Sequence, residues 1–247
     1  MFLRAICYIY PMKQRVGLFL ILAVAFTACK NKCIEDSGKH IEKKIVAKNF
    51  DKISLSGAVK LVLNQDSSYA ITVSADSNVI DEIETKVSGS ELTVKLDEDK
   101  YCGTDSVVVH VGIGLLTQLT AKDGSALISE GLLKLGDLKL DFTGAVVASL
   151  NVQAGKITTT SEGASTLKLT GQAGQHDVIS KGTITLNAPD FTVGIYKLDI
   201  KGAGKSKINV LNELYVETAG ASEITYRGNP KTVKENKKGV GKLEKVN

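Results

Sequence analysis

Three histidines, His40, His110 and His176, are the side chains of this chain best suited to acid–base chemistry near neutral pH, and they lie in different regions. A general base must lie within hydrogen-bond reach of the proton that it removes, and no local Ser-His-Asp signature provides such a pair. His176 falls between Ile157 and Tyr196 in a column of residues that we expect to point inward. We therefore predict a hydrogen-bonded core histidine at position 176 and no catalytic residue in the chain.

Cation binding has one weak candidate in the sequence. Asp97, Glu98 and Asp99 form an acidic run, and Asp105 follows nearby. The run lacks the spaced ligands and the glycine of a calcium loop, so a solvated turn is the favoured interpretation. We expect no metal and no cofactor.

The N-terminus has the pattern of a bacterial lipoprotein signal. Residues 13–15 (Lys-Gln-Arg) precede an apolar run that is too short to span a bilayer and ends near Cys29. Residues 26–29 (Phe-Thr-Ala-Cys) resemble a lipobox, after which Cys29 would carry lipid. Residues 1–28 are then a signal peptide, although cleavage by ordinary signal peptidase after Ala25 or Ala28 is an alternative, and Met12 is an alternative start.

Two further cysteines remain after this processing. Cys7 lies in the removed segment, so Cys33 and Cys102 are left to pair in an oxidising envelope compartment. Sequence gives no distance between them, and their spacing does not match a metal site. A disulfide between Cys33 and Cys102 is therefore one possible state of these two thiols.

Glycines in the second half of the chain reveal the elements that must position any site. They recur at intervals of 18 to 20 residues, at Gly124, Gly144, Gly163, Gly182, Gly202, Gly220 and Gly239. A second column runs in phase with the first, at Gly136, Gly155, Gly174, Gly194 and Asn212. A fixed period of this length indicates stacked repeats, each with two strand-like runs and two corners. Alanine follows four of the first-column glycines, which is typical of a tight structural corner.

Within each run, apolar and polar residues alternate. Leu138 and Leu140 are predicted to point inward, whereas Asp137, Lys139 and Asp141 point to water. This period-two pattern is typical of β-strands with one buried face. Stacking each coil of about 19 residues on its sequence neighbour gives a right-handed parallel β-helix, or β-solenoid, of the all-β class.

Three regions follow from these patterns. Residues 29–47 read as a polar tether, and residues 48–247 as one β-helical domain. Within it, residues 48–118 are less regular and are expected to form the first turns and a cap, while residues 119–247 form the regular array. Residues 78–87 have the spacing of a short helix. A separate small domain at residues 48–118 is the alternative.

Charge excludes one class of partner. The chain has a formal charge of +4, which falls to +1 when residues 1–28 are removed. Residues 30–48 carry +3 and residues 231–247 carry +4, so the body between them is about −6. This balance argues against nucleic-acid binding. The basic residues after Cys29 suit either anionic lipid or a solvated tether.

Three segments together suggest a family. Residues 50–57 (Phe-Asp-Lys-Ile-Ser-Leu-Ser-Gly), the recurring Gly-Ala corners and the closing residues 226–230 (Tyr-Arg-Gly-Asn-Pro) with residues 239–241 (Gly-Val-Gly) resemble the head GIN domain family, described as auto-transporter adhesins. The resemblance covers roughly residues 48–245. It implies a β-helical envelope lipoprotein or secreted protein of a Gram-negative bacterium, and it supplies no motif of functional residues.

The expected function is non-enzymatic binding or adhesion at the cell envelope. The lipid would anchor the protein to the outer membrane, on the periplasmic or the external side, with a glycan or an envelope protein as its partner. A carbohydrate-active β-helix enzyme is the main alternative, but such enzymes need carboxylates, a basic residue and often calcium on one face. After residue 28 the chain has a single arginine, Arg227, and no tryptophan to stack on a sugar. A purely structural spacer is the third possibility.

Overall fold

Strands make up most of the computed structural model, which describes residues 33–97 and 101–246. The elements in chain order are β1 (His40–Val46), β2 (Lys52–Ser56), β3 (Val59–Gln65), β4 (Ala70–Asp76), η1 (Ile80–Glu82), β5 (Glu84–Ser88), β6 (Glu91–Lys95), β7 (Val107–Ile113), β8 (Gln118–Lys122), β9 (Ala126–Glu130), β10 (Leu133–Lys134), β11 (Asp137–Arg227) and β12 (Thr232–Lys245). The 3-10 helix η1 is the only helix among the described residues. The all-β prediction is confirmed.

Buried apolar and exposed polar residues alternate along these strands, as the sequence indicated. In β2, Ile53 and Leu55 are fully buried, while Lys52 is exposed and Ser54 and Ser56 are partly exposed. The same alternation of buried and exposed positions continues through the 91 residues of β11. Each strand therefore presents one apolar face to a shared interior and one polar face to solvent.

All twelve strands belong to one sheet, which does not close on itself. Two series of strands lead away from β11: β8, β2, β6 and β5 on one side, and β9, β3, β7, β4 and β1 on the other. β10 and β12 also pair with β11. Most pairs are parallel, but β1–β4, β4–β7 and β5–β6 are antiparallel. The sheet is therefore mixed, and its antiparallel pairs lie at the N-terminal end, where the sequence predicted a less regular β cap on a parallel β-helix.

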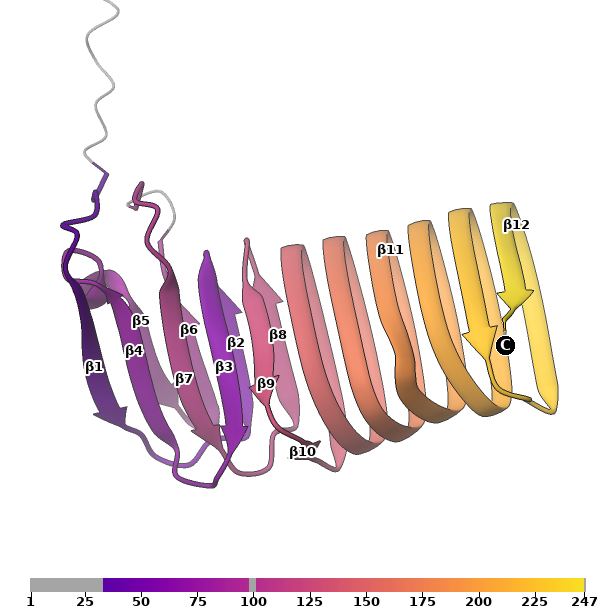
Figure 1. The fold of residues 1–247 in the computed structure, drawn as a ribbon, viewed down its shortest axis with the longest axis horizontal. Coiled ribbons are helices and arrows are strands. Elements are labelled where there is room, and N and C mark those ends of the chain that lie inside the picture. The colour runs from indigo at the N-terminus through magenta and orange to yellow at the C-terminus, as the bar shows by residue number, and fades with distance from the viewer. Residues whose placement is uncertain (1–32, 98–100, 247) are drawn as a thin grey trace, which may run out of the picture. The chain divides into compact units, whose positions relative to one another are not determined.

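The order of the early strands also departs from the sequence order. β2 lies between β6 and β8, and β3 lies between β7 and β9, so each of these early strands is inserted between two strands that come later in the chain. Figure 1 shows this arrangement, with β3 and β2 between β7 and β9. The expectation that each coil stacks on its sequence neighbour therefore fails for residues 48–130. A parallel strand needs a long crossover connection, which permits such an insertion.

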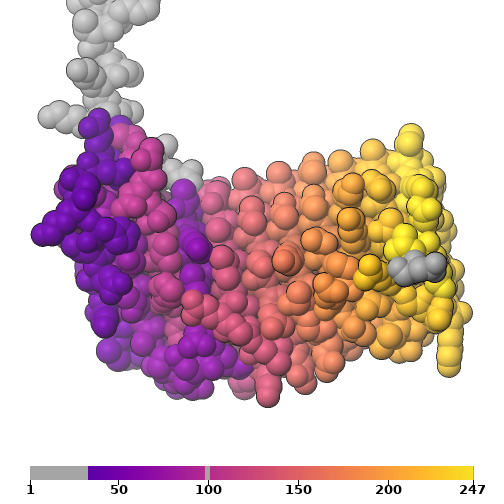
Figure 2. Space-filling model, in the orientation of Figure 1, coloured from indigo at the N-terminus to yellow at the C-terminus, as the bar shows by residue number. Residues whose placement is uncertain are grey.

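The regular part of the chain keeps its predicted period. Figure 1 draws β11 as a ribbon that turns back on itself repeatedly before it reaches β12. The pairing of β12 with β11 joins residues that are 19 positions apart, from Glu213 with Thr232 to Tyr226 with Lys245. In Figure 2 the outer side chains of this region repeat at regular steps from one turn to the next.

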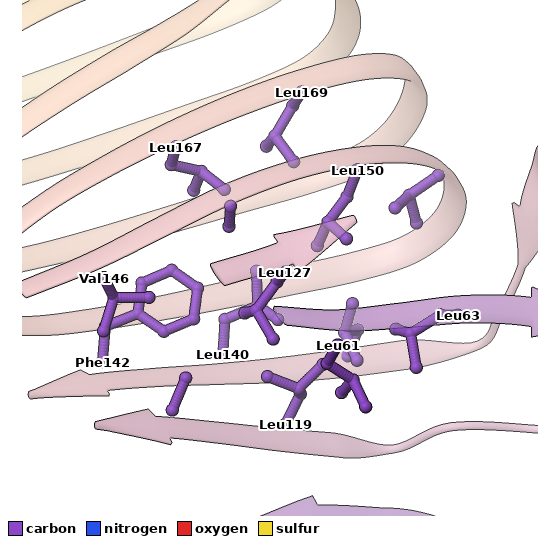
Figure 3. Close-up of a cluster of buried hydrophobic side chains, with 14 of the residues drawn as sticks. Leu61, Leu63, Leu119, Leu127, Leu140, Phe142, Val146, Leu150, Leu167 and Leu169 are labelled. Carbon is purple, nitrogen blue, oxygen red and sulfur yellow. The ribbon is translucent and has the colours of Figure 1, made fainter. Parts of the chain in front are cut away.

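The core is one continuous apolar cluster that runs through the inner faces of the strands. Figure 3 shows a part of it, where side chains from β3, β8, β9 and β11 point toward one another. They include Leu61, Leu119, Leu127, Leu140 and Phe142, all of which are buried. No single turn could bury these side chains alone, so stacking supplies the hydrophobic stabilisation.

Two segments differ from their expected state. Residues 40–46, expected within the polar tether, form β1, which pairs with β4 in antiparallel register. Residues 78–87, expected as a short helix, contain only η1 before β5 begins at Glu84. Ile80 and Ile83 are still buried, so the spacing of the apolar residues predicted which side chains are buried but did not predict the backbone conformation. The predicted signal peptide at residues 1–28 lies outside the described residues.

Candidate functional site

A groove on the outer face of β11 and β12 gathers side chains from four successive turns. We call it the outer groove, and its volume is about 430 Å³. Its outward side chains form two adjacent columns along the stack, one with Asp177, Lys197, Tyr215 and Lys234 and one with Ile179, Asp199, Glu217 and Asn236. The columns arise because residues two apart on a strand share a face, and equivalent residues of successive turns lie side by side. The volume lies within the range of small-molecule sites.

Tyr215 is the aromatic centre of the outer groove. Its hydroxyl donates a hydrogen bond of 2.7 Å to the Glu213 carboxylate, and this bond, together with burial, raises the pKa of the phenol. The ammonium groups of Lys197 and Lys234 lie 5.9 and 5.5 Å from the centre of the ring. Such cation–π contacts and the hydrogen bond hold the ring in one place.

Two carboxylates of the groove, those of Asp177 and Asp199, form ion pairs with lysines. Burial alone would raise the pKa of Asp177, but its 2.8 Å ion pair with Lys156 and its hydrogen bond from Gln175 bring the pKa below the ordinary value. Asp199 pairs with Lys201 through Oδ2 at 3.2 Å, while its Oδ1 is buried and has no hydrogen-bond partner among the described residues. These groups can accept hydrogen bonds from hydroxyls, and the lysines can donate them.

His176 is where the sequence placed it, in the interior. It is fully buried, and its Nε2 lies 2.9 Å from Thr159 Oγ1. Its ring contacts those of Tyr196 and Phe191, and burial lowers its pKa to about 3. The prediction of a hydrogen-bonded core histidine is confirmed, and this histidine takes no part in an outer site.

The acidic residues proposed as weak cation ligands, Asp97, Asp99 and Asp105, are only partly described. Asp97 is described and partly exposed, whereas Asp99 lies outside the described residues. Asp105 Oδ2 lies 2.7 Å from His40 Nδ1, so this carboxylate is engaged by a histidine. In the part of the chain that the structure describes, no group of three or more His, Cys, Asp or Glu side chains could hold a metal ion.

Two of the cysteines, Cys33 and Cys102, are among the described residues. Cys33 and Cys102 are each in a disulfide bond. The backbone pairs Ile34 with Tyr101, and the Cys102 amide donates to the Ile34 carbonyl at 3.1 Å. The pairing of Cys33 with Cys102 stays a prediction. Cys29, the predicted lipidation site, lies outside the described residues.

The corner glycines stand at sharp turns of the backbone. All six that the sequence singled out, Gly124, Gly144, Gly163, Gly182, Gly202 and Gly220, have a positive φ. At Gly163, where φ is 114°, an added Cβ would lie 2.7 Å from the Gly144 carbonyl oxygen. An added Cβ at Gly182 would collide with the Gly163 carbonyl oxygen. The backbones of successive turns therefore approach each other too closely at these corners for a side chain.

Two arrangements were missed at the level of sequence. The outer groove could have been found by aligning the outward positions of the repeats, because Lys197, Tyr215 and Lys234 then fall in one column. A hydrogen-bonded chain of Ser74, His40 and Asp105 could not, because these residues come from segments that only the strand pairing brings together.

Comparison with known families gives the chain its relatives. The family model described as "Putative auto-transporter adhesin, head GIN domain" matches residues 49–230. The chain belongs to this family. This agrees with the resemblance found in residues 50–57 and in the glycine corners. No curated protein sequence matches the chain.

Solved structures of three bacterial proteins of similar size share the fold. A "putative adhesin" from Bacteroides fragilis NCTC 9343 aligns with a TM-score of 0.77 at 22% identity, over 86% of this chain and 100% of its own. A "putative adhesin" from Parabacteroides distasonis ATCC 8503 gives 0.68 at 21% identity, over 86% and 99%. A "putative lipid binding protein" from the same strain gives 0.67 at 18% identity, over 87% and 100%. Likeness at these identities concerns the fold. Among the described residues, no helix has both the length and the hydropathy needed to cross a membrane.

Proposed function

We propose that this family member is an adhesion protein of the cell envelope that binds a glycan in the outer groove and carries out no catalysis there. The observation that carries the proposal is the groove itself, in which the aromatic ring of Tyr215 stands among carboxyl groups and lysine side chains. The names of the family and of its solved relatives support an adhesive role.

Glycan chemistry suits this set of side chains. A sugar ring has apolar C–H faces that pack on a phenol ring and hydroxyls that bond to carboxylates and ammonium groups. Asp199 and Glu217 line the groove, and their carboxylates can accept hydrogen bonds from sugar hydroxyls. The two columns also run along the stack, so neighbouring turns would contact successive units of a polymer.

A hydrolytic role for the same groove is not favoured. Carbohydrate hydrolysis requires one carboxyl group to stay protonated near neutral pH as a general acid. Asp177, the groove carboxylate with the most cationic contacts, has a lowered pKa instead. The acids and bases of this face are also paired with one another, between successive turns in Lys156–Asp177 and within one turn in Lys201–Asp199.

Anchoring and architecture complete the proposal. We place the mature N-terminus at a lipidated Cys29 on the outer membrane of a Gram-negative bacterium. We also propose that β8 to β12 wind as a right-handed parallel β-helix, because parallel crossovers have this hand in nearly all proteins. A rigid stack of turns held by a membrane anchor would present the outer groove to ligands in a fixed orientation.

The test is binding of immobilised neutral and acidic polysaccharides by purified protein. Tyr215→Ala is expected to weaken binding about tenfold or more, since buried aromatic contacts contribute roughly 1–3 kcal/mol per ring in comparable sites. Lys197→Ala should also weaken binding. Lys168→Ala changes an exposed lysine outside the groove and is the matched control. Binding that survives both groove substitutions would refute the proposed site, and cleavage of any polysaccharide would refute the non-enzymatic role.

A further inference from the structure

Ser74, His40 and Asp105 form a continuous hydrogen-bonded chain on the outer face of the N-terminal strands. Ser74 Oγ lies 2.7 Å from His40 Nε2, and His40 Nδ1 lies 2.7 Å from Asp105 Oδ2. The three residues come from β4, from β1 and from the loop before β7. The antiparallel register places His40 opposite Asp76, two positions from Ser74, so the serine and the histidine are diagonal neighbours on one face.

We propose that these three side chains form a nucleophilic centre in which Ser74 accepts an acyl group from small esters. A nucleophile hydrogen-bonded to a base, with the base oriented by a third group, is the arrangement by which serine is activated in proteins of unrelated folds. The proposal goes beyond the glycan groove and uses none of its residues.

Asp105 is held so that it can orient the imidazole. Its Oδ1 accepts a hydrogen bond from the Ser106 amide at 2.8 Å, and its own amide donates to Asp36 Oδ2 at 3.1 Å. The Tyr101 hydroxyl donates to Asp36 Oδ1 at 2.6 Å and lies 3.0 Å from the Asp105 carbonyl oxygen. With Oδ1 engaged by Ser106, Oδ2 faces His40. It stabilises the tautomer with the proton on Nδ1, which leaves the Nε2 lone pair directed at the Ser74 hydroxyl.

The three hydrogen-bonded side chains are accessible to a substrate. The His40 side chain is 45% exposed and that of Asp105 is 34% exposed. Ser74 is partly exposed on a strand whose partners place Glu42 on one side of it and Val108 on the other. Val108 offers an apolar contact for a short acyl chain, and the Glu42 carboxylate disfavours anionic substrates. The chemical class that fits is therefore a neutral or cationic ester with a short acyl group.

The proposed reaction has two halves. Ser74 Oγ forms a bond to the carbonyl carbon while its proton moves to His40 Nε2, and the bond from that carbon to the alkoxy oxygen breaks as Nε2 returns the proton to the departing alcohol. Water then attacks the acyl-serine by the same route and releases the carboxylic acid. Asp105 stays ionised throughout and stabilises the transient imidazolium.

Covalent labelling tests the centre directly. We expect a fluorophosphonate probe to form an adduct on Ser74, located by peptide mass spectrometry, and p-nitrophenyl acetate to leave a transient acetyl group on the same residue. Ser74→Ala should abolish both signals. His40→Gln should slow labelling of Ser74 about 100-fold, because a positioned general base contributes roughly 10²- to 10⁴-fold.

Matched variants separate activation from folding. Ser77→Ala changes a neighbouring, partly exposed serine, and His110→Gln changes an exposed histidine on β7, so both should label like the wild type. Thermal melts of all variants show which of them fold. The absence of an adduct on Ser74, or equal labelling of Ser74 in a folded His40→Gln protein, would overturn the proposal.

Discussion

The imidazole ring of His176 lies in the interior, where water cannot solvate its charged form. His176 is fully buried between rings and accepts or donates one hydrogen bond with Thr159, and burial lowers its pKa from 6.5 to about 3. Its neutral form is therefore part of the folded state. The unfolded chain binds a proton on this residue near pH 6.5, whereas the folded chain does not.

Acidification should consequently weaken the fold through this residue. Stability that is present above pH 6.5 should decline as the pH falls from 6.5 toward 3, by at most about 1.4 kcal/mol per pH unit. Replacing His176 by Gln removes the titration, so the variant's free energy of unfolding should vary less between pH 6.5 and 4.5. Urea unfolding at a series of pH values measures this. His110→Gln, at an exposed site, is the control, and parallel pH profiles for wild type and His176→Gln would contradict the argument.

At the scale of the element, the corner of each turn depends on the absence of a side chain. Valine at Gly163 or Gly182 would have to keep a positive φ and press on the carbonyl of the preceding turn. Strain of this kind costs on the order of 1–3 kcal/mol. We expect both Gly163→Val and Gly182→Val to lower the denaturation midpoint clearly, with Gly182→Val at least as severe.

Gly136 provides a matched glycine for this comparison. It belongs to the second column, its φ is not positive, and an added Cβ would meet no atom within 4 Å. Gly136→Val should therefore change stability by only about 0.5 kcal/mol. Equal losses at Gly136 and Gly182 would show that the close approach of successive turns does not limit the residue type at the corner.

These corners also show how far sequence could predict this molecule. In residues 119–247, the recurring glycines and the alternation of apolar and polar residues predicted the strands, the length of the repeat and the buried faces. They could do so because each of these features recurs in every turn and reflects a requirement of the local backbone or side-chain packing. No sequence feature indicates that β2 and β3 lie between later strands. Ser54 pairs with both Thr93 and Thr120, and any strand with the same apolar alternation would satisfy either pairing. The outer groove was readable as a column, whereas the chain from Ser74 to Asp105 depends on that non-local order.

At the scale of the whole molecule, attachment to the membrane should depend on one residue, Cys29. If Cys29 is acylated, Cys29→Ser should move the protein from the membrane fraction to the soluble fraction, and intact mass should show the loss of the acyl groups. Fractionation of cells followed by mass spectrometry makes this measurement. A variant that stays with the membrane, together with a wild type without added acyl mass, would contradict the lipoprotein assignment.

A disulfide between Cys33 and Cys102 is the second expectation at this scale. Non-reducing digestion should release one linked peptide that contains both residues, and reduction should separate it. Closing a loop of this length with a disulfide typically stabilises a protein by about 2–4 kcal/mol, so reduction should lower the melting temperature. Linked peptides that join either cysteine to a different one would exclude the pairing.

The insertion of β2 and β3 sets an order in time for the biogenesis of this protein. Both strands leave the ribosome, and any export channel, before either of their parallel neighbours has been made. Lys52 must wait for Gln118, and Asn64 must wait for Glu130, before the ladder on that side can form. Contacts between such distant residues form slowly, because the intervening loop must close first. For that interval two apolar strands have unpaired edges, so the earliest part of the body to be synthesised is among the last to be protected from chaperones, proteases and wrong partners.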